Sequence, residues 1–249
     1  MIEIKKLRVG YARNTVIDDL SLDIREGEIT SLVGVNGSGK STLLRSLAGV
    51  RRQSSGDIII DGVDASRLTP VQRARAVSYL PQKMSAPDMT AEQMVLHGRF
   101  PHTAFPHRYT RDDLNKAHEA MERLGVEKYA TTRLDELSGG TLRRVCLAMA
   151  LCQDTRYILL DEPTAYLDPS SGLELMRVLR LLANDGRGIV AVMHDLPMAM
   201  SFSDRVAILS GGRITCARSP EMMLEDRVID KTFGVVLEKN EYGVYYYKY

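Results

Sequence analysis

The first third of this 249-residue chain alternates between hydrophobic and polar positions, as strands with one buried face do. The strands predicted there lie at residues 2–4, 7–9, 20–24, 29–33, 56–62 and 77–80. The run at 29–33, Ile-Thr-Ser-Leu-Val, carries no charge and reads as a buried strand. Pro81 ends the last of these strands, because proline has no N–H to donate to a sheet.

Helical spacing begins at about residue 84. Thr90 and Gln93 form a capping-box pattern at the start of one helix. Thr110 with Asp113 opens a second helix, which Gly125 ends. The apolar stripe expected on this second helix consists of Leu114, Ala117, Met121 and Leu124. Two prolines and two histidines between residues 100 and 109 predict a loop.

The second half of the chain alternates buried strands with helices. Apolar runs at 157–162 and 189–193 predict strands of a parallel sheet. Asp168 and Pro169 form the cap and first residue of a helix between them. The inward positions expected on that helix are Leu173, Met176, Leu179 and Leu182. Gly211-Gly212 predicts a hairpin turn between two short strands.

Composition excludes several classes of protein. The chain is 44% hydrophobic and 26% charged, as expected of a globular protein with a sizeable core. Its net charge of +1 gives no support for a nucleic-acid partner. The first residues lack the apolar core of a signal peptide, and no apolar run approaches the ~18 residues of a membrane span. The cysteines and histidines lack zinc-ligand spacing, so Cys146, Cys152 and Cys216 are expected to be reduced thiols.

A glycine-rich loop separates the strand at 29–33 from a predicted helix. Residues 34–41, Gly-Val-Asn-Gly-Ser-Gly-Lys-Ser, fit the P-loop pattern. Its glycines let backbone N–H groups turn towards an anion. Lys40 brings a positive charge to the β- and γ-phosphates, and the Ser41 hydroxyl can bind Mg²⁺. The alternative is a glycine-rich turn with an incidental lysine, and the strand before the loop and the helix after it make this alternative less favoured. The loop therefore predicts a nucleotide site.

Further candidate groups follow other predicted strands or precede a helix. Asp161 and Glu162 end the strand at 157–162, at the edge where open α/β sheets bind ligands, and His194 follows the strand at 189–193. Asp161 suits Mg²⁺, and Glu162 could orient a water molecule, although both could also be solvated carboxylates that close a strand. Residues 138–140, Ser-Gly-Gly, open a helix whose N-terminus is suited to an anion. A self-contained nucleotide site with one P-loop needs no second phosphate-binding helix start, so this one is unexplained.

The motifs up to residue 141 resemble those of the ATP-binding cassette (ABC) ATPases. Gly34–Thr42 resembles the Walker A loop and Gln82 the Q-loop residue. Residues 137–141, Leu-Ser-Gly-Gly-Thr, resemble the family signature. Thr141 departs from it, since the family usually has glutamine there. Tyr11 could be an ordinary strand-edge aromatic, but it falls where the family stacks an aromatic ring on adenine.

The resemblance continues through the second half, so it covers nearly the whole chain. Residues 157–162 resemble Walker B, and His194 resembles the switch histidine. Residues 165–168, Ala-Tyr-Leu-Asp, are similar to the D-loop. Six elements in this order and spacing are very specific.

The resemblance implies an α/β fold of the P-loop NTPase (RecA-like) type, with a mainly parallel sheet, an antiparallel β subdomain and an inserted helical subdomain. Residues 1–249 would form a single ABC ATPase domain. Within it, residues 1–82 and 151–249 would form the α/β core with the β subdomain, and residues 83–150 the helical subdomain. In the family, two copies pack head to tail, so that the signature of one covers the ATP on the P-loop of the other. This arrangement explains the second anion-binding helix start.

The resemblance also implies a role for each matching residue. The residues expected to be catalytic are Lys40, Gln82, Glu162 and His194. Glu162 would polarise the attacking water, and His194 would hold the γ-phosphate. The expected Mg²⁺ ligands are Ser41, Gln82 and Asp161. The residues expected to bind ATP are Tyr11, Asn36, Gly37, Ser38, Gly39, Lys40, Ser41 and Thr42, with Ser138, Gly139 and Gly140 of a second copy.

Two segments resemble one branch of the family, the importers of iron-siderophores, haem and cobalamin. These are Met89–His102, which follows the Q-loop, and residues 232–235, Thr-Phe-Gly-Val, in the tail. The branch implies an ATP-hydrolysing subunit that powers uptake through separate permease subunits, with a substrate-binding protein acting indirectly. The protein would lie peripherally on the cytoplasmic face of the cell membrane. Its permease dock is expected to include Arg99, Phe100, Pro101 and His102.

Two alternatives come from other classes. A soluble ABC ATPase with a non-transport role, on ribosomes or DNA, would normally show tandem cassettes or a long coiled-coil insertion, and this chain has neither. A non-hydrolysing regulatory module would lack part of the catalytic set, which is complete here. The cargo stays open, because the binding protein and the permease select it.

Overall fold

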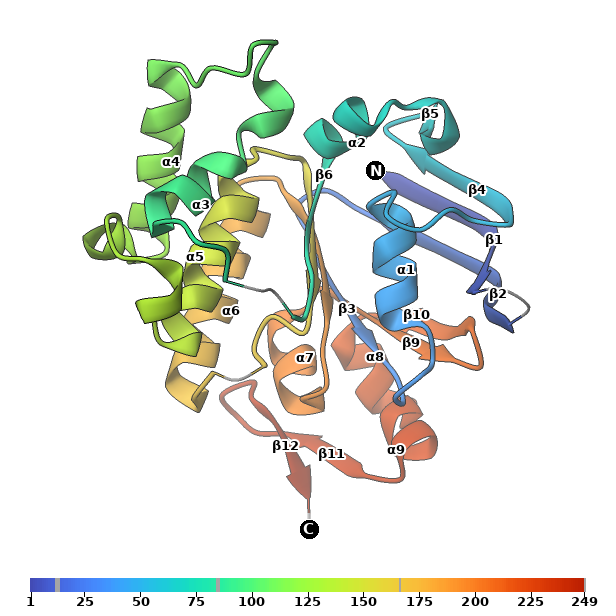
Figure 1. Cartoon of the computed structure of the whole chain (residues 1–249). Coiled ribbons are helices and arrows are strands. Elements are labelled where there is room, and N and C mark those ends of the chain that lie inside the picture. The colour runs from blue at the N-terminus through green and yellow to red at the C-terminus, as the bar shows by residue number, and fades with distance from the viewer. Residues whose placement is uncertain (12–13, 84–85, 166, 249) are drawn as a thin grey trace.

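A mainly parallel sheet runs through the middle of the molecule (Figure 1). The computed structural model describes residues 1–11, 14–83, 86–165 and 167–248, and within these ranges the sheet has six strands in the order β10-β9-β3-β8-β7-β6. Its strands are β3 (Ile29–Val33), β6 (Val77–Leu80), β7 (Tyr157–Asp161), β8 (Gly188–Val192), β9 (Arg205–Ser210) and β10 (Arg213–Arg218). All neighbours pair in parallel except β10, which pairs with β9 across the predicted Gly211-Gly212 turn. The predicted α/β class with a mainly parallel sheet is confirmed.

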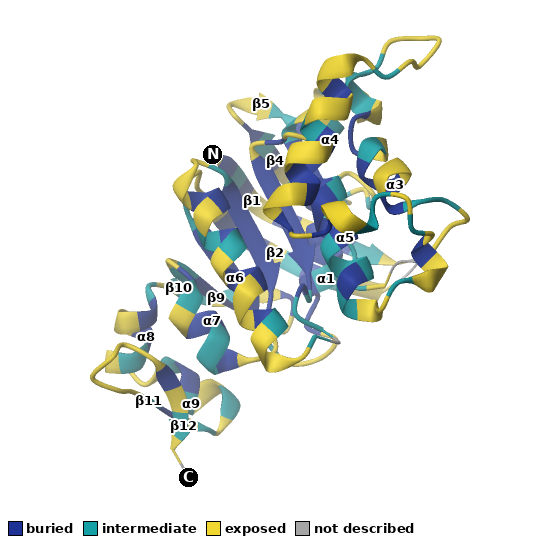
Figure 2. Ribbon diagram, turned by 90° about the vertical axis from the view of Figure 1, so that its left-hand side faces the viewer, coloured by how far each residue is buried: buried dark blue, intermediate teal, exposed yellow. Residues whose placement is uncertain are grey.

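The central strands are buried on both faces, and their sequences are mainly apolar for that reason, with Thr30 and Ser31 of β3 as buried polar exceptions. Side chains on one face, such as Ile158 and Ile189, pack with the helices at the left of Figure 1. Those on the other face, such as Leu159 and Val190, pack with helix α1 (Lys40–Leu47) and a second sheet. Figure 2 shows these buried strands between helices whose outer faces are exposed.

The second sheet is antiparallel, as predicted for the β subdomain. Its order is β2-β1-β4-β5, and its strands are β1 (Ile2–Tyr11), β2 (Asn14–Ile24), β4 (Ser55–Ile60) and β5 (Val63–Asp64). Residues 2–4 and 7–9, which the pattern separates, belong to one strand, β1. The pairing of β1 with β2 shifts register between Ile4 and Leu7, where Lys6 has φ 46°. Such a bulge moves the following side chains to the other face and interrupts the alternation.

Hydrogen-bonded caps start three helices at the predicted residues Thr90, Thr110 and Asp168. Capping boxes at Thr69, Thr90 and Thr110 open α2, α3 and α4. Besides α1, the α-helices are α2 (Pro70–Ala76), α3 (Ala91–His97), α4 (Arg111–Arg123), α5 (Gly139–Cys152), α6 (Pro169–Asn184), α7 (Leu196–Phe202), α8 (Pro220–Glu225) and α9 (Val228–Phe233). Shorter elements are the 3₁₀ turns η1 (Ala65–Arg67), η2 (Phe100–His102), η3 (Glu127–Tyr129) and η4 (Leu134–Glu136), and a hairpin of β11 (Val236–Lys239) and β12 (Tyr245–Lys248).

Helices α3, α4 and α5 pack on one another at the left of Figure 1. We propose that they form the helical subdomain expected at 83–150. Helix α5 continues to Cys152 and also packs against β6, so it joins this layer to the core.

The inward faces of two helices differ from the predicted stripes. Leu114 of α4 and Leu173 of α6 are 46% and 40% exposed, so their assignment to the buried faces is wrong. The buried positions include Ala120 and Leu175 instead. A helix turns about 100° per residue, so a stripe assigned from apolar residues alone can include a leucine at the edge of the buried arc.

A buried ion pair fixes the layer of α3, α4 and α5 internally. Arg99 is only 4% exposed, and its Nε donates a hydrogen bond to Asp113 Oδ1 at 2.8 Å. The guanidinium also donates to the Cys152 carbonyl at 3.1 Å. Burial by itself would raise the pKa of Asp113, but the hydrogen bonds from Arg99 and Thr110 outweigh it and lower this pKa to about 2. Arg99 therefore stabilises the packing of α3, α4 and α5. Its side chain is buried, so its expected place in a permease dock is wrong.

Replacing Asp113 by alanine should leave the Arg99 guanidinium buried without its carboxylate. We expect the free energy of unfolding to fall by about 3–5 kcal/mol, measured by urea denaturation at pH 7. The matched control is Asp112→Ala, since Asp112 is exposed and lies 3.9 Å from Lys116, a pair worth about 0.5 kcal/mol or less.

The pH dependence should identify the carboxylate. The folded-state pKa of Asp113 lies below its ordinary value of 3.8, so its contribution is complete above that pH and is lost as the pH falls towards 2. The difference between parent and Asp113→Ala should therefore shrink over this range. A loss no larger than that of Asp112→Ala would contradict the assignment.

Candidate nucleotide-binding site

The glycine-rich loop joins β3 to α1 in a conformation that its sequence explains. Gly39 has φ 108° at the N-cap of α1, and Gly37 has φ 78°. At Gly34, a Cβ atom would lie 2.2 Å from the carbonyl oxygen of Leu209 in β9. The backbone approaches β9 so closely that only glycine fits there.

Lys40 folds back over this loop. Its Nζ donates hydrogen bonds to the carbonyls of Gly34 at 2.7 Å and Val35 at 3.0 Å. Burial lowers the pKa of Lys40, and the nearby Glu162 and Asp161 carboxylates oppose that effect. The ammonium group is therefore desolvated beside the helix N-terminus, where an anionic ligand would regain the lost solvation.

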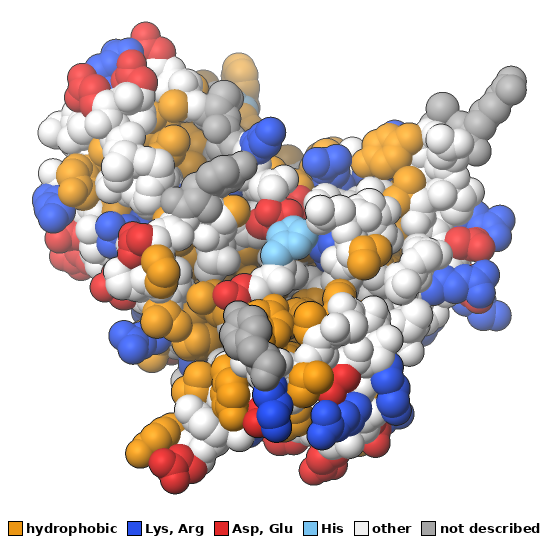
Figure 3. Space-filling view, turned by 90° about the horizontal axis from the view of Figure 1, so that it is seen from below, with side chains coloured by type: hydrophobic (Ala, Val, Ile, Leu, Met, Phe, Trp, Pro, Cys, Tyr) orange, Lys and Arg blue, Asp and Glu red, His pale blue; other side chains and the backbone are white. Residues whose placement is uncertain are grey.

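The P-loop residues surround one cavity of about 330 Å³. Its lining consists of Val16, Asn36, Gly37, Ser38, Gly39, Lys40, Ser41, Thr42, Glu162 and His194. All the predicted ATP-binding residues of the loop thus face two of the predicted catalytic residues. Figure 3 views the molecule from this end of the sheet, where a histidine lies beside acidic side chains under a notch between two lobes. Val16 was not predicted, and its place in β2 carries no sequence signal of a site.

Asp161 ends β7 and is 1% exposed. It accepts hydrogen bonds from the Ser41 hydroxyl at 2.9 Å and the Tyr79 hydroxyl at 3.4 Å. Burial raises the pKa of Asp161, and the neighbouring Glu162 carboxylate adds to this rise, while the hydrogen bond from Ser41 and the charge of Arg45 oppose it. A buried carboxylate beside a hydroxyl is an oxygen donor set that fits Mg²⁺, whose charge would offset the desolvation. Tyr79 was not predicted, since a tyrosine within a strand gives no sign of a metal site.

Two other predicted catalytic residues, Gln82 and His194, contact Glu162. Its Oε2 accepts a hydrogen bond from Gln82 Nε2 at 2.5 Å, and its Oε1 lies 2.7 Å from His194 Nε2. A carboxylate only accepts, so His194 Nε2 carries a proton in this contact. Each oxygen accepts one hydrogen bond and keeps a further lone pair that can accept a proton from water. The amide nitrogen of Gln82 faces Glu162, so its expected Mg²⁺ ligation through the carbonyl oxygen stays a prediction.

Glu162 itself has an unfavourable backbone. Its φ of 51° lies in the left-handed region, which costs a residue with a side chain about 1–2 kcal/mol. Strain of this kind persists only where the surroundings impose it, and it is frequent at active sites.

Tyr11 lies outside the lining of the P-loop cavity and is 39% exposed. The Arg51 guanidinium lies 4.2 Å from the centre of its ring, a cation–π contact that no sequence signal predicts. Hydrogen bonds from Thr42 and Arg45 lower the pKa of Tyr11. Adenine would therefore have to stack on the other face of the ring or displace Arg51, and its contact with Tyr11 stays a prediction.

The signature residues lie apart from this cavity. Ser138 caps α5, and its Oγ accepts a hydrogen bond from the Thr141 N–H at 3.2 Å and lies 2.9 Å from Thr141 Oγ1. Within the described ranges, Ser138, Gly139 and Gly140 are not among the residues that line the P-loop cavity. Of the D-loop motif, Tyr166 lies outside the described residues, and Asp168 caps α6.

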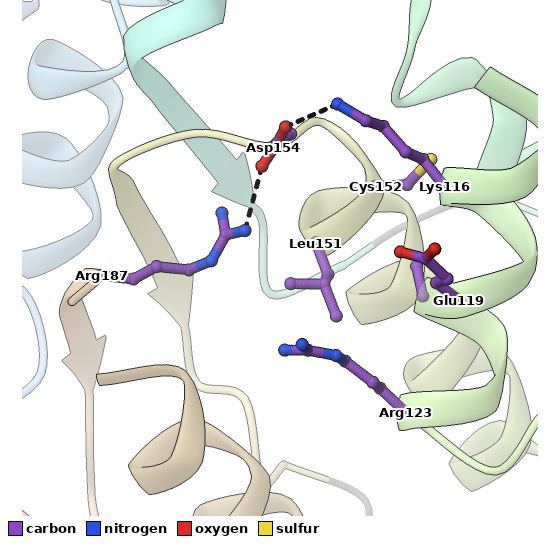
Figure 4. A pocket seen from close by; sticks show the side chains of 8 residues that line it. Lys116, Glu119, Arg123, Leu151, Cys152, Asp154 and Arg187 are labelled. Atoms are coloured by element: carbon purple, nitrogen blue, oxygen red, sulfur yellow. Dashed lines mark hydrogen bonds and ion pairs between the residues drawn. The ribbon is translucent and has the colours of Figure 1, made fainter. Parts of the chain in front are cut away.

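Another cavity, of about 170 Å³, lies between α4 and the amino ends of β7 and β8 (Figure 4). Its cations are already matched: Lys116 and Arg187 both contact Asp154, at 2.9 and 3.0 Å. Arg123 pairs with Asp185 at 3.0 Å. These pairs leave little free positive charge for a phosphate, so the P-loop cavity is the candidate nucleotide site.

A protein-family model described as ABC transporter matches residues 17–165. The chain belongs to the ABC transporter family. The petrobactin import ATP-binding protein FpuD of Bacillus anthracis is 36% identical over 93% of this cassette and 86% of its own length. The iron(3+)-hydroxamate import ATP-binding protein FhuC of Bacillus subtilis is 37% identical over 94% and 88%. The hemin import ATP-binding protein HmuV of Rhodococcus jostii is 37% identical over 92% and 78%.

Solved structures agree with this cassette in fold. The dimeric post-hydrolysis state of the ATP-binding cassette MJ0796 bound to ADP and Pi is 26% identical, with a TM-score of 0.78 over 88% of this chain and 99% of that one. A nucleotide-free ATP-binding cassette at 21% identity has a TM-score of 0.84. The predicted family and the predicted cassette fold are confirmed.

The close approach at Gly34 gives a test of the loop geometry. Gly34→Ala would drive a Cβ into the Leu209 carbonyl, and we expect it to lower the free energy of unfolding by about 3 kcal/mol or more. Gly37→Ala is the matched control, because its Cβ would meet nothing within 4 Å and only its positive φ costs about 1–2 kcal/mol. Urea denaturation measures both. Equal losses would contradict the described packing of the loop on β9.

Proposed function

We propose that this cassette binds and hydrolyses ATP to power the import of an iron chelate through separate permease subunits. The observation that carries the ATPase activity is the meeting of Gln82, Glu162 and His194 at the edge of the P-loop cavity. The cargo class is supported by relatives whose names specify petrobactin, iron hydroxamate or hemin import.

The P-loop would bind the phosphates of ATP. The loop residues and the first residues of α1 line the cavity, and Lys40 can exchange its two carbonyl partners for phosphate oxygens. Ser41 and Asp161 would hold Mg²⁺. When bound, the metal ion neutralises phosphate charge during phosphoryl transfer.

Glu162 would act as the base that orients and deprotonates the attacking water. Gln82 and His194 hold its carboxylate in place, and each carboxylate oxygen keeps a lone pair that can accept a hydrogen bond from water. His194 lines the same cavity, so on release its Nε2–H can donate to the γ-phosphate.

A second copy would complete the site. Ser138, Gly139 and Gly140 present a helix N-terminus that the cassette's own P-loop cavity does not use. A head-to-tail dimer would place these residues over the partner's nucleotide. The structurally similar MJ0796 cassette is dimeric. ATP would supply part of the interface, so we expect a monomer in its absence.

The permease would bind beside η2, on the cytoplasmic face of the membrane, with a substrate-binding protein acting only through the permease. Among the described residues, no helix is both long and apolar enough to span a bilayer. Phe100 and Phe105 are 51% and 89% exposed, and the His107 ring stacks on Phe100 with 4.6 Å between ring centres. His102 bonds to the Gln153 carbonyl at 2.9 Å, so the dock is better placed on Phe100 and Phe105 than on the whole predicted segment.

Glu162→Gln tests the catalytic role. We expect turnover to fall by ~10²–10⁴-fold, equivalent to about 3–5 kcal/mol of barrier, with ATP binding retained. Sedimentation of this variant should show a dimer with ATP and a monomer without it. Glu174→Gln on the exposed side of α6 is the control and should leave turnover unchanged. Near-normal turnover in Glu162→Gln, or an equally tight dimer without nucleotide, would contradict the proposal.

Replacing Phe100 and Phe105 together by alanine tests the dock. Basal ATPase of the purified cassette should stay nearly unchanged, while binding to the permease should weaken by about 1–4 kcal/mol if these rings are interface anchors. Leu181→Ala, at an exposed position of α6, is the control for the loss of exposed apolar surface. Unimpaired permease binding and transport would place the dock elsewhere.

A further inference from the structure

Arg143 lies in the first turns of α5, close behind the signature, and binds backbone rather than side chains. Its guanidinium donates hydrogen bonds to the carbonyls of Pro81 (2.8 Å), Gln82 (3.3 Å), Asp161 (2.9 Å), Glu162 (3.0 Å) and Pro163 (3.4 Å). One side chain therefore joins α5 to the chain segments that follow β6 and β7. Those segments carry Gln82 and Glu162.

The guanidinium of Arg143 is half-buried, and its hydrogen-bond partners are backbone carbonyls. Burial lowers the pKa of Arg143, and in the described part of the chain no carboxylate lies within ion-pair distance of it. A half-buried cation with only carbonyl partners is energetically unfavourable unless its donors are well satisfied. The N–H groups of this guanidinium connect the carboxyl end of β6 to the carboxyl end of β7.

The strained backbone of Glu162 is what this contact holds. Arg143 donates hydrogen bonds to the Asp161 and Glu162 carbonyls, which come directly before and after the Cα atom of Glu162, the residue with φ 51°. Strain at an active-site residue persists only when neighbouring contacts impose it. Arg143 supplies two such contacts, and it bonds to the Gln82 carbonyl at the same time.

We propose that Arg143 is a positioning residue that sets the backbone of Glu162 and Gln82 and ties the signature helix of each protomer to that protomer's own hydrolysis site. This inference rests on the proposed ATPase function. Ser138 at the start of α5 would contact the nucleotide of the partner copy. A displacement of α5 on closure therefore moves Arg143 and, with it, the backbone that aims the Glu162 carboxylate.

The test is Arg143→Met, which keeps an unbranched apolar side chain and removes all the N–H donors. We expect kcat to fall about tenfold to a hundredfold, as for a misplaced catalytic group, with KM for ATP and the binding of a fluorescent ATP analogue changed less than about threefold. Arg143→Lys keeps the charge but cannot span both strand ends, so it should recover only part of the activity.

Arg73→Met is the matched control. Arg73 is also half-buried, its pKa is also lowered by burial, and it donates to the carbonyls of Ser46 (2.5 Å), Leu47 (2.9 Å) and Ala65 (3.3 Å), away from Gln82 and Glu162. It should lower the melting temperature as Arg143→Met does. At temperatures where both variants are folded, its kcat should stay within about twofold of the parent value.

Two further measurements decide whether Arg143 acts through Glu162. In the Glu162→Gln background, Arg143→Met should slow turnover by less than about twofold more, since residues that act as a unit are not additive. Hydrogen–deuterium exchange should become several-fold faster in peptides containing Gln82 and Glu162 in Arg143→Met, but not in Arg73→Met. Unchanged exchange in those peptides, or effects that multiply in the double variant, would overturn the inference. A parent protein without ATPase would refute the proposed function, and the exchange experiment would still decide the positioning role.

Discussion

Parallel pairing of β3, β8, β7 and β6 is the constraint on which the site depends. Parallel strands end at the same edge of a sheet, so the groups that follow them come together. The P-loop follows β3, Glu162 follows β7, His194 follows β8 and Gln82 follows β6. Gln82 and Glu162 are 80 residues apart in the sequence, yet their side chains form a hydrogen bond.

Charged side chains that are partly desolvated lie together at this edge of the sheet. Burial lowers the pKa of Lys40 and raises that of Asp161, so each group is held where its own charge is disfavoured. A phosphate beside Lys40 and a divalent cation beside Asp161 would each restore the missing opposite charge. Ser41 and Asp161 are already in contact, which is the advantage of a preorganised electrostatic site, whereas Lys40 would have to exchange its carbonyl partners for phosphate oxygens.

Helix α5 connects this edge to the rest of the molecule. Ser138 lies at its start, Arg143 holds the strand ends, and Gln153 at its end donates to the Ala74 carbonyl at 2.5 Å. The buried Arg99 also bonds to the Cys152 carbonyl near that end. A movement of the layer formed by α3, α4 and α5 would therefore reach the catalytic backbone through one rigid element rather than through loops.

The sequence by itself determined the central strands, several helix caps, the P-loop and the motif residues of the site, because each depends on spacing within one segment or on a specific motif. Val16 and Tyr79, which belong to no motif, were found only in the structure. The tertiary structure alone decided the bulge in β1, the exposure of Leu114, the burial of Arg99 and the contacts of Arg143. Arg143 and Pro81, for example, are 62 residues apart in the sequence. Their contact depends on how a helix packs on strand ends, and no local pattern of hydrophobic and polar residues encodes that geometry.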